Sequence, residues 1–254
     1  MIKVLVNGAL GRMGRTVVAA VNADSELELV GAVDIVAGEV GGMTVETNLD
    51  TALKKFSPDV MVDFTQPKVV FDNVMTALKN KVSPVVGTTG LSDDAKEKIR
   101  ALAEENQTPA FIAPNFALGA VLMMLLSRKA AKYMPDVEII ELHHDKKLDA
   151  PSGTAELTAK MISEVRQPHK QGHPDEVERL EHVRGAEVDG IRIHSVRLPG
   201  YVAHQEVIFG GLGQTLTIRH DSMGRESFMP GVVLACKKVR GLTGLTIGLD
   251  KLLD

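Results

Sequence analysis

The chain has 254 residues, of which 44% are hydrophobic and 24% charged, and its formal net charge is −4. This composition is typical of a globular protein that is large enough to form one large domain or two small ones. The weak negative charge argues against the basic surface that nucleic-acid binding needs, so we expect no nucleic-acid partner. The only cysteine, Cys236, cannot form an intrachain disulfide, which favours a reducing compartment.

The sequence gives no indication of a membrane partner. The apolar run from Phe116 to Leu126 is too short to span a bilayer. No signal peptide precedes the first predicted element, because residues 1–6 already have the pattern of a strand. We therefore expect a cytoplasmic protein.

The first half of the chain alternates short β-branched runs with longer amphipathic stretches, which predicts a parallel sheet with crossover helices. The predicted strands are Lys3–Asn7, Leu27–Asp34, Asp59–Phe64, Val82–Val86 and Pro109–Ala113. The predicted helices are Arg12–Ala23, Pro67–Lys79 and Asp93–Asn106. Pro67 suits a first helical position and Ser92 suits an N-cap.

After Pro114 the pattern changes to that of a second domain. A helix over Gly119–Met134 precedes a strand over Val137–Leu142, and a further helix follows Ser152. The polar segment Arg166–Gly185, which contains Pro168, is predicted to be a mobile surface loop. Three segments look like antiparallel strands: Ile191–Arg197, Gln205–Phe209 and Gln214–His220. The expected fold class is α/β, with an N-terminal Rossmann-like doubly wound parallel sheet and a second α+β domain that contains a mixed or antiparallel sheet.

A glycine-rich turn follows the first strand, with Gly8, Gly11 and Gly14 at GxxGxxG spacing. Leu10 stands where the usual GxGxxG motif has its middle glycine, so the turn alone is also compatible with no ligand. The second strand ends at Asp34, twenty residues after Gly14, where a Rossmann fold places the acid that binds the ribose hydroxyl. Together the two features predict a dinucleotide-binding site.

Three later loops also follow predicted strands: residues 63–67, 87–90 and 113–116. Ligands of open α/β sheets lie outside the carboxyl ends of the strands, so these loops are expected to line the nicotinamide half of the site, although each taken alone is more often a plain turn. Asp34 followed by Ile35 favours a free 2′-hydroxyl, and Arg12 can relieve the repulsion of a 2′-phosphate. We therefore predict that NADH is used well and that NADPH is tolerated.

Cationic side chains and a helix start occur together near the middle of the chain. The strand that ends near residue 142 delivers His143 and His144, and Lys147 lies four residues beyond His143. The N–H groups of Gly153 and Thr154 open the next helix and are available to an anion. This combination predicts a receptor for a carboxylate-bearing substrate with a group able to move a proton.

Each of these residues also has a simpler interpretation. A single histidine at a strand end is usually a surface or core hydrogen-bonding group. Lys146 is expected to be solvated, Ser152 can serve only as an N-cap, and Asp149 can simply pair with a lysine. It is the cluster as a whole that points to a substrate site.

The segment ELHHDKKLDAPSGTA, residues 141–155, closely resembles the signature E-x-H-H-x-x-K-x-D-A-P-S-G-T-A of the 4-hydroxy-tetrahydrodipicolinate reductases, also called dihydrodipicolinate reductases. The resemblance extends to NGALGRMGR, VDFTQP, VVGTTG and APNFALG and so covers nearly the whole chain. It implies a reductase of the diaminopimelate route to lysine that transfers a hydride from NADH or NADPH to a cyclic dicarboxylate, with loss of water.

The resemblance also implies roles for individual residues. His143 corresponds to the catalytic proton donor/acceptor, Lys147 to the second proton donor, and His144, Ser152, Gly153 and Thr154 to substrate contacts. The implied cofactor contacts are Gly8, Ala9, Leu10, Gly11, Arg12, Met13, Asp34, Gly87, Thr88, Thr89, Ala113, Pro114, Asn115 and Phe116. No metal is implied. Some members carry arginine where this chain has Ile35, which bears on the choice of cofactor.

Domain organisation follows from the same resemblance. It implies a dinucleotide-binding domain of residues 1–114 and 227–254, and a substrate-binding and oligomerisation domain of residues 115–226 whose sheet builds a homotetramer. Because the cofactor and substrate signals lie in different domains, domain closure is expected during turnover.

Three alternative functions are compatible with parts of this pattern. An amino-acid or diaminopimelate dehydrogenase would require free ammonia. A non-catalytic nicotinamide-binding protein would not oxidise NADH. A zinc hydrolase would need ligands among His143, His144, His169 and His173, but the adjacent pair lacks helical i, i+4 spacing and the other two lie in the polar loop.

Overall fold

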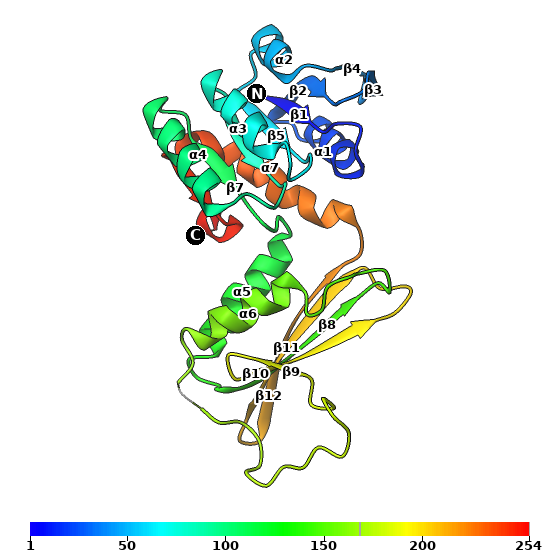
Figure 1. Ribbon diagram of the computed structural model, residues 1–254, viewed down its shortest axis with the longest axis vertical. Helices are drawn as coiled ribbons and strands as arrows, with labels where there is room; N and C mark the ends of the chain where they lie inside the picture. The colour runs from blue at the N-terminus through cyan, green and yellow to red at the C-terminus, as the bar shows by residue number, and fades with distance from the viewer. Residues whose placement is uncertain (168, 254) are drawn as a thin grey trace. The chain divides into compact units, whose positions relative to one another are not determined.

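The structure is a computed structural model that describes residues 1–167 and 169–253. Pro168 of the predicted polar loop and Asp254, the last residue of the predicted dinucleotide domain, lie outside the described residues. The chain forms two compact units (Figure 1). Unit 1 comprises Met1–Leu118 and Arg225–Asp254, and unit 2 comprises Gly119–Gly224. None of the helices in the described ranges is long and apolar enough to cross a membrane.

Unit 1 contains an eight-stranded sheet in the order β13-β7-β6-β5-β1-β2-β4-β3. Its strands are β1 (Ile2–Asn7), β2 (Leu27–Val33), β3 (Gly38–Val40), β4 (Met43–Glu46), β5 (Val60–Asp63), β6 (Ser83–Val86), β7 (Ala110–Ile112) and β13 (Leu245–Ile247). All neighbouring pairs are parallel except β3 and β4. The expected Rossmann-like parallel sheet is therefore confirmed.

Helices cover this sheet because its strands are apolar on both faces. They are α1 (Arg12–Ala23), α2 (Leu49–Phe56), α3 (Val70–Lys79), α4 (Asp93–Glu105) and α7 (Met229–Lys238), with 3-10 turns η1 (Arg225–Phe228), η2 (Val239–Gly241) and η3 (Leu249–Leu252). Leu5 of β1 packs in a cluster with Ala52 of α2 and Ala77 of α3. The period of two then directs Val4 and Val6 to the opposite face, and both are fully buried.

The strand order determines where the loops of unit 1 meet. Strand β1 lies between β2 and β5: the chain passes from β1 to β2 on one side and from β5 outward to β6 and β7 on the other, so the strand order reverses beside β1. Because β1, β5, β6 and β7 run parallel, the loops that follow them lie at one edge of the sheet. Such a reversal point is where open α/β sheets bind ligands.

Unit 2 contains a five-stranded mixed sheet in the order β12-β11-β8-β10-β9. Its elements are α5 (Leu118–Ala130), β8 (Asp136–His143), α6 (Gly153–Ser163), β9 (Ala186–Val188), β10 (Ile191–Arg197), β11 (Ala203–Gly211) and β12 (Gln214–Ser222). Burial alternates along β8, where Val137, Ile139 and Glu141 are buried and the residues between them are half-buried. Alternate residues of β8 therefore belong to two different faces of the sheet.

Several predictions of local structure are wrong in detail. Helix α3 begins at Val70, so Pro67 is not a first helical residue but lies in the turn before it. Strand β10 does not pair with the strands that follow it, because it pairs in parallel with β8, which separates it from β11. The short strands β3, β4, β9 and β13 and helices α2 and α7 were not predicted. Ser92 does cap α4, by accepting from the N–H of Ala95.

Candidate active site

The glycine turn after β1 is held against the end of β2. Gly8 has a φ of 81°, which a residue with a side chain rarely adopts, and its N–H donates to the carbonyl of Val33. The N–H of Ala9 donates to the same carbonyl. A Cβ at Gly14 would lie 2.0 Å from the carbonyl oxygen of Gly8, so only glycine permits this approach of α1 to the turn.

The predicted ribose acid lies directly beside this turn. One carboxylate oxygen of Asp34 accepts from the N–H of Leu10 at 2.8 Å, and the other accepts from the N–H of Ile35 at 2.7 Å. Gly11 is the N-cap of α1 and supplies no side-chain cap, so the first N–H groups of the helix have no partner within it. Arg12 is exposed and Met13 half-buried in this first turn. The geometry fits an anionic, ribose-containing ligand.

A buried carboxylate, the first residue of the predicted loop 63–67, connects the next two loops. Asp63 at the end of β5 is fully buried and accepts hydrogen bonds from Asn7, Asn73, Thr65 and Thr88 at 2.8–3.0 Å. Thr88 also accepts from the N–H of Thr65 at 2.7 Å. The position of Asp63 at a strand end was visible in the sequence, but its burial and its partners were not.

This network changes what the predicted contacts can offer to a ligand. The Thr88 hydroxyl is engaged by Asp63, whereas Thr89 is exposed. A Cβ at Gly87 would lie 2.1 Å from the ring of Phe64, so a side chain at this position would displace that ring.

The loop after β7 alternates buried and more exposed residues. Ala113 and the ring of Phe116 are buried, and Phe116 packs edge-on against Phe111 with ring centroids 6.0 Å apart. Pro114 is exposed, and the Asn115 side chain accepts from the N–H of Ala117 at 2.9 Å. The side chains of Ala113 and Phe116 are therefore not exposed to a cofactor.

In unit 2 the predicted catalytic histidine is hydrogen-bonded to a buried acid. His143, the last residue of β8, places Nδ1 2.5 Å from a carboxylate oxygen of Glu141. Arg197 of β10 binds both oxygens of Glu141, at 2.9 and 2.6 Å. Parallel pairing of β10 with β8 puts Arg197 opposite His143. The sequence does not predict Glu141 or Arg197 as site residues, although Glu141 is the first residue of the signature-like segment 141–155.

Lys147 is held by the acid two residues after it. Its ammonium group donates to both carboxylate oxygens of Asp149 at 2.7 and 2.8 Å. The main-chain carbonyl of Asp149 accepts from Arg197 at 2.9 Å. His144 is exposed, and its carbonyl accepts from the N–H of Lys147. The structure thus connects His143 to Lys147 through the Glu141–Arg197 pair.

The start of α6 adds a potential anion site to the same segment. The Ser152 hydroxyl is buried and caps α6 by accepting from the N–H of Ala155 at 3.2 Å, and its N–H donates to Glu141. The N–H groups of Gly153 and Thr154 are the first of α6, and the first N–H groups of a helix have no acceptor within the helix. Gly153 is exposed and a Cβ there would meet nothing within 4 Å, so the approach to these groups is open.

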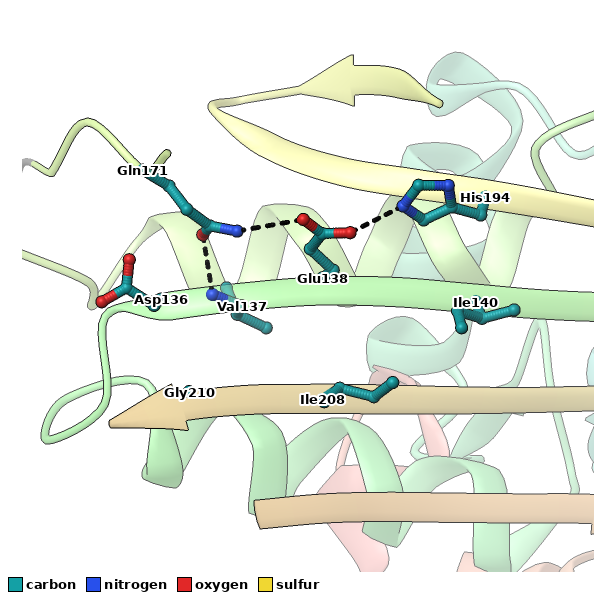
Figure 2. A pocket seen from close by; sticks show the side chains of 8 residues that line it. All are labelled: Asp136, Val137, Glu138, Ile140, Gln171, His194, Ile208 and Gly210. Carbon is teal, nitrogen blue, oxygen red and sulfur yellow. Dashed lines mark hydrogen bonds and ion pairs between the residues drawn. The ribbon is translucent and has the colours of Figure 1, made fainter. Parts of the chain in front are cut away.

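A separate cavity of about 450 Å³ lies on the other face of the unit 2 sheet (Figure 2). Its lining includes Ile140, Ile208 and the polar group of Glu138, His194 and Gln171. Glu138 accepts from His194 at 2.7 Å, and Gln171 of the predicted polar loop accepts from the N–H of Val137 at 2.8 Å. None of the predicted site residues lines this cavity.

Comparisons with known proteins agree over both units. The family description "dihydrodipicolinate reductase, N-terminus" matches residues 2–116, and "dihydrodipicolinate reductase, C-terminus" matches residues 119–253. A 4-hydroxy-tetrahydrodipicolinate reductase from Desulfitobacterium hafniense is 53% identical over 100% of this chain and 99% of its own. The corresponding protein from Halalkalibacterium halodurans is 52% identical, with complete coverage of both chains.

A solved structure is also similar throughout. The dipicolinate-bound dihydrodipicolinate reductase from Paenisporosarcina sp. TG-14 is 48% identical to this chain, with a TM-score of 0.94 and complete coverage of both chains.

The environment of Glu141 predicts an acid-dependent loss of stability. Burial acts to raise the pKa of this carboxyl, but hydrogen bonds from His143, Arg197 and Ser195 outweigh it and lower the pKa from 4.5 to about 2. A carboxyl whose pKa is lowered by folding stabilises the folded state above its unfolded pKa, and this contribution disappears as the pH falls through the folded pKa. We expect Glu141→Gln to lower the free energy of unfolding by up to about 3 kcal/mol at neutral pH, with the difference from the wild type shrinking between pH ~4.5 and ~2.

Urea unfolding from pH 7 down to pH 3 measures this difference. A Glu141→Gln deficit that stays constant over the whole range would contradict the assignment.

Proposed function

The chain belongs to the dihydrodipicolinate reductase family, and on that premise we propose that His143 and Lys147 supply the protons for the reduction that the chain catalyses. The protein is an NAD(P)H-dependent oxidoreductase that converts 4-hydroxy-tetrahydrodipicolinate to tetrahydrodipicolinate in diaminopimelate and lysine biosynthesis. One hydride and one proton enter the substrate and one water leaves. The names of the relatives do not favour an amino-acid dehydrogenase or a non-catalytic binding protein.

In this proposal unit 1 holds the dinucleotide. The glycine turn from Gly8 to Met13 and the free N–H groups of α1 receive the pyrophosphate, and Asp34 receives the adenosine ribose. The loops at Gly87–Thr89 and Ala113–Phe116 receive the nicotinamide half. When bound, the cofactor supplies the hydride from carbon 4 of its nicotinamide ring. The support comes from the required glycines and from the orientation of the Asp34 carboxylate by Leu10.

Unit 2 binds the substrate in this proposal. The dicarboxylate is an anion, and the first N–H groups of α6 at Gly153 and Thr154 are suited to one of its carboxylates. His144 and the start of α6 at Ser152 complete the contacts. Ser152 takes part through its position as the cap, because its hydroxyl already accepts from Ala155.

The observation that carries the proton-donor proposal is the single hydrogen-bonded network that joins His143, Lys147 and the start of α6. An imidazole can donate or accept a proton near neutral pH, and an ammonium group can donate one to the electron-rich nitrogen or enamine that hydride addition leaves behind. The positive charge of the Lys147 side chain also stabilises negative charge that develops on the substrate.

Substitution tests these roles directly. We expect His143→Ala and Lys147→Ala to lower kcat by ~10²–10⁴ with a smaller change in the KM for NADH, because the change removes a proton donor. Thr154→Val should mainly raise the KM for substrate. The measurement is NADH oxidation with enzymatically generated 4-hydroxy-tetrahydrodipicolinate. Lys146→Ala, which removes the exposed neighbouring lysine, is the matched control; near-normal kcat for both the His143 and Lys147 variants would refute the roles.

Cofactor preference follows from the charge of Asp34. We expect NADH to be used well and NADPH to be tolerated, and a preference of more than ~100-fold for NADPH in kcat/KM, or ~2.7 kcal/mol, would contradict this. Asp34→Asn keeps an oxygen that can accept from Leu10 but removes the charge that repels a 2′-phosphate, so it should shift the ratio toward NADPH. Asp72→Asn, at an exposed position in the first turn of α3, should leave the ratio unchanged. An unaltered ratio in Asp34→Asn would show that Asp34 does not contact the ribose.

We also propose that the sheet of unit 2 builds a homotetramer and that the protein is cytoplasmic. The half-buried Ile140 and Ile208, beside the cavity of Figure 2, support a protein partner for that sheet face. Light scattering should give four times the chain mass of 27.4 kDa. A monomeric mass at micromolar concentration would contradict the tetramer without affecting the catalytic roles.

A further inference from the structure

We propose that Glu141 is the positioning residue of the substrate site: it selects Nε2 as the nitrogen of His143 that faces the substrate and, with Arg197, fixes the segment that carries Lys147. The inference rests on the proposed roles of His143 and Lys147 and adds to them a residue that does not itself contact the substrate. It assigns the proton exchange of His143 to one atom.

The first step is the chemistry of the Glu141 carboxylate. Its side chain is fully buried, and Arg197 binds it through two hydrogen bonds. A carboxylate in a bidentate pair with a guanidinium is ionised and can only accept hydrogen bonds. The Nδ1 atom of His143, 2.5 Å away, must therefore carry the proton of that contact. In the neutral imidazole, Nε2 is then unprotonated and is the nitrogen left to exchange a proton with the substrate.

The second step concerns Lys147. The guanidinium of Arg197 that binds Glu141 also donates to the carbonyl of Asp149 at 2.9 Å. The carboxylate of Asp149 holds the Lys147 ammonium group through both oxygens. Glu141 therefore acts on Lys147 through one guanidinium and one short turn of the chain.

The third step reaches the helix that is proposed to bind the substrate carboxylate. The N–H of Ser152, the N-cap of α6, donates to the second oxygen of Glu141 at 3.3 Å. The Glu141 carboxylate thus contacts the imidazole of His143, the guanidinium of Arg197 and the N-cap residue of α6. A side chain that locks several functional groups in this way usually affects turnover when it is changed, although it never touches the substrate.

The same strand provides a matched control. Glu138 also pairs with one histidine and one arginine, His194 and Arg184, but it lies on the other face of the sheet, where it lines the cavity of Figure 2. Glu138 pairs with the same two types of side chain but has no link to His143, so its substitution reports what the loss of such a pair does to the stability and assembly of unit 2.

The experiment compares Glu141→Gln with Glu138→Gln in the full-length protein. Glutamine keeps the size and an accepting oxygen but removes the charge that imposes the Nδ1–H tautomer and binds Arg197. We expect Glu141→Gln to lower kcat at least ~10-fold while the KM for NADH changes little, because unit 1 is untouched. Glu138→Gln should keep kcat within ~3-fold of the wild type, whatever its effect on stability. A Glu141→Gln kcat within that same range would overturn the inference.

A measurement on the unaltered protein covers the case in which Glu141→Gln does not fold. Nitrogen-15 NMR of histidine-labelled wild type distinguishes the two neutral tautomers of His143, with His143→Gln used only to assign its signals. Protonated Nδ1 with unprotonated Nε2 supports the inference, and the opposite tautomer overturns it. A wild type that fails to oxidise NADH in the presence of the substrate would refute the proposed function instead, so the two failures are distinguishable.

Discussion

The cost of burying a carboxylate is the constraint around which each unit of this protein is organised. A charged side chain is tolerated inside a protein only when ionic or hydrogen-bonding partners surround it. In unit 1, Asp63 meets this requirement by drawing together side chains from the loops after β5 and β6, from β1 and from α3. In unit 2, Glu141 does so with an imidazole, a guanidinium and a main-chain N–H. The groups that satisfy these two acids are, or adjoin, the groups proposed to act on ligands.

The two units reach chemical function by different routes. Unit 1 offers a left-handed glycine, helix N–H groups, the Asp34 carboxylate and loops in which Thr88, Ala113 and Phe116 are buried. Such a surface suits a cofactor that is bound but not altered in its carbon skeleton. Unit 2 offers side chains that can move protons, and these need accurate orientation because a proton transfer depends on distance and direction. This difference explains why the ionic network is denser around β8 and β10 than around the glycine turn.

Much of this arrangement could be predicted from the sequence. Helix Arg12–Ala23 and strand Ile191–Arg197 have the predicted bounds, because the local period of apolar residues indicates them. The parallel pairing of β10 with β8 could not be predicted, since it depends on a partner about fifty residues away. For the same reason, the sequence does not predict that Arg197 lies beside His143. The burial of Asp63 and Glu141 could not be predicted, because an acid near a strand end has the same local pattern whether it is buried or exposed.

The alternation of faces along β8 limits how the gene can change in length. Glu138 and Glu141 lie three residues apart and therefore on opposite faces, each with its own histidine and arginine. Inserting or deleting one codon between them would exchange the two faces for every residue beyond that point and would leave an acid without its partners. The connection between α6 and β9 is not part of a sheet, so a change in its length does not move side chains from one sheet face to the other. Natural variation in length among relatives should therefore accumulate in this connection and spare the eight residues of β8.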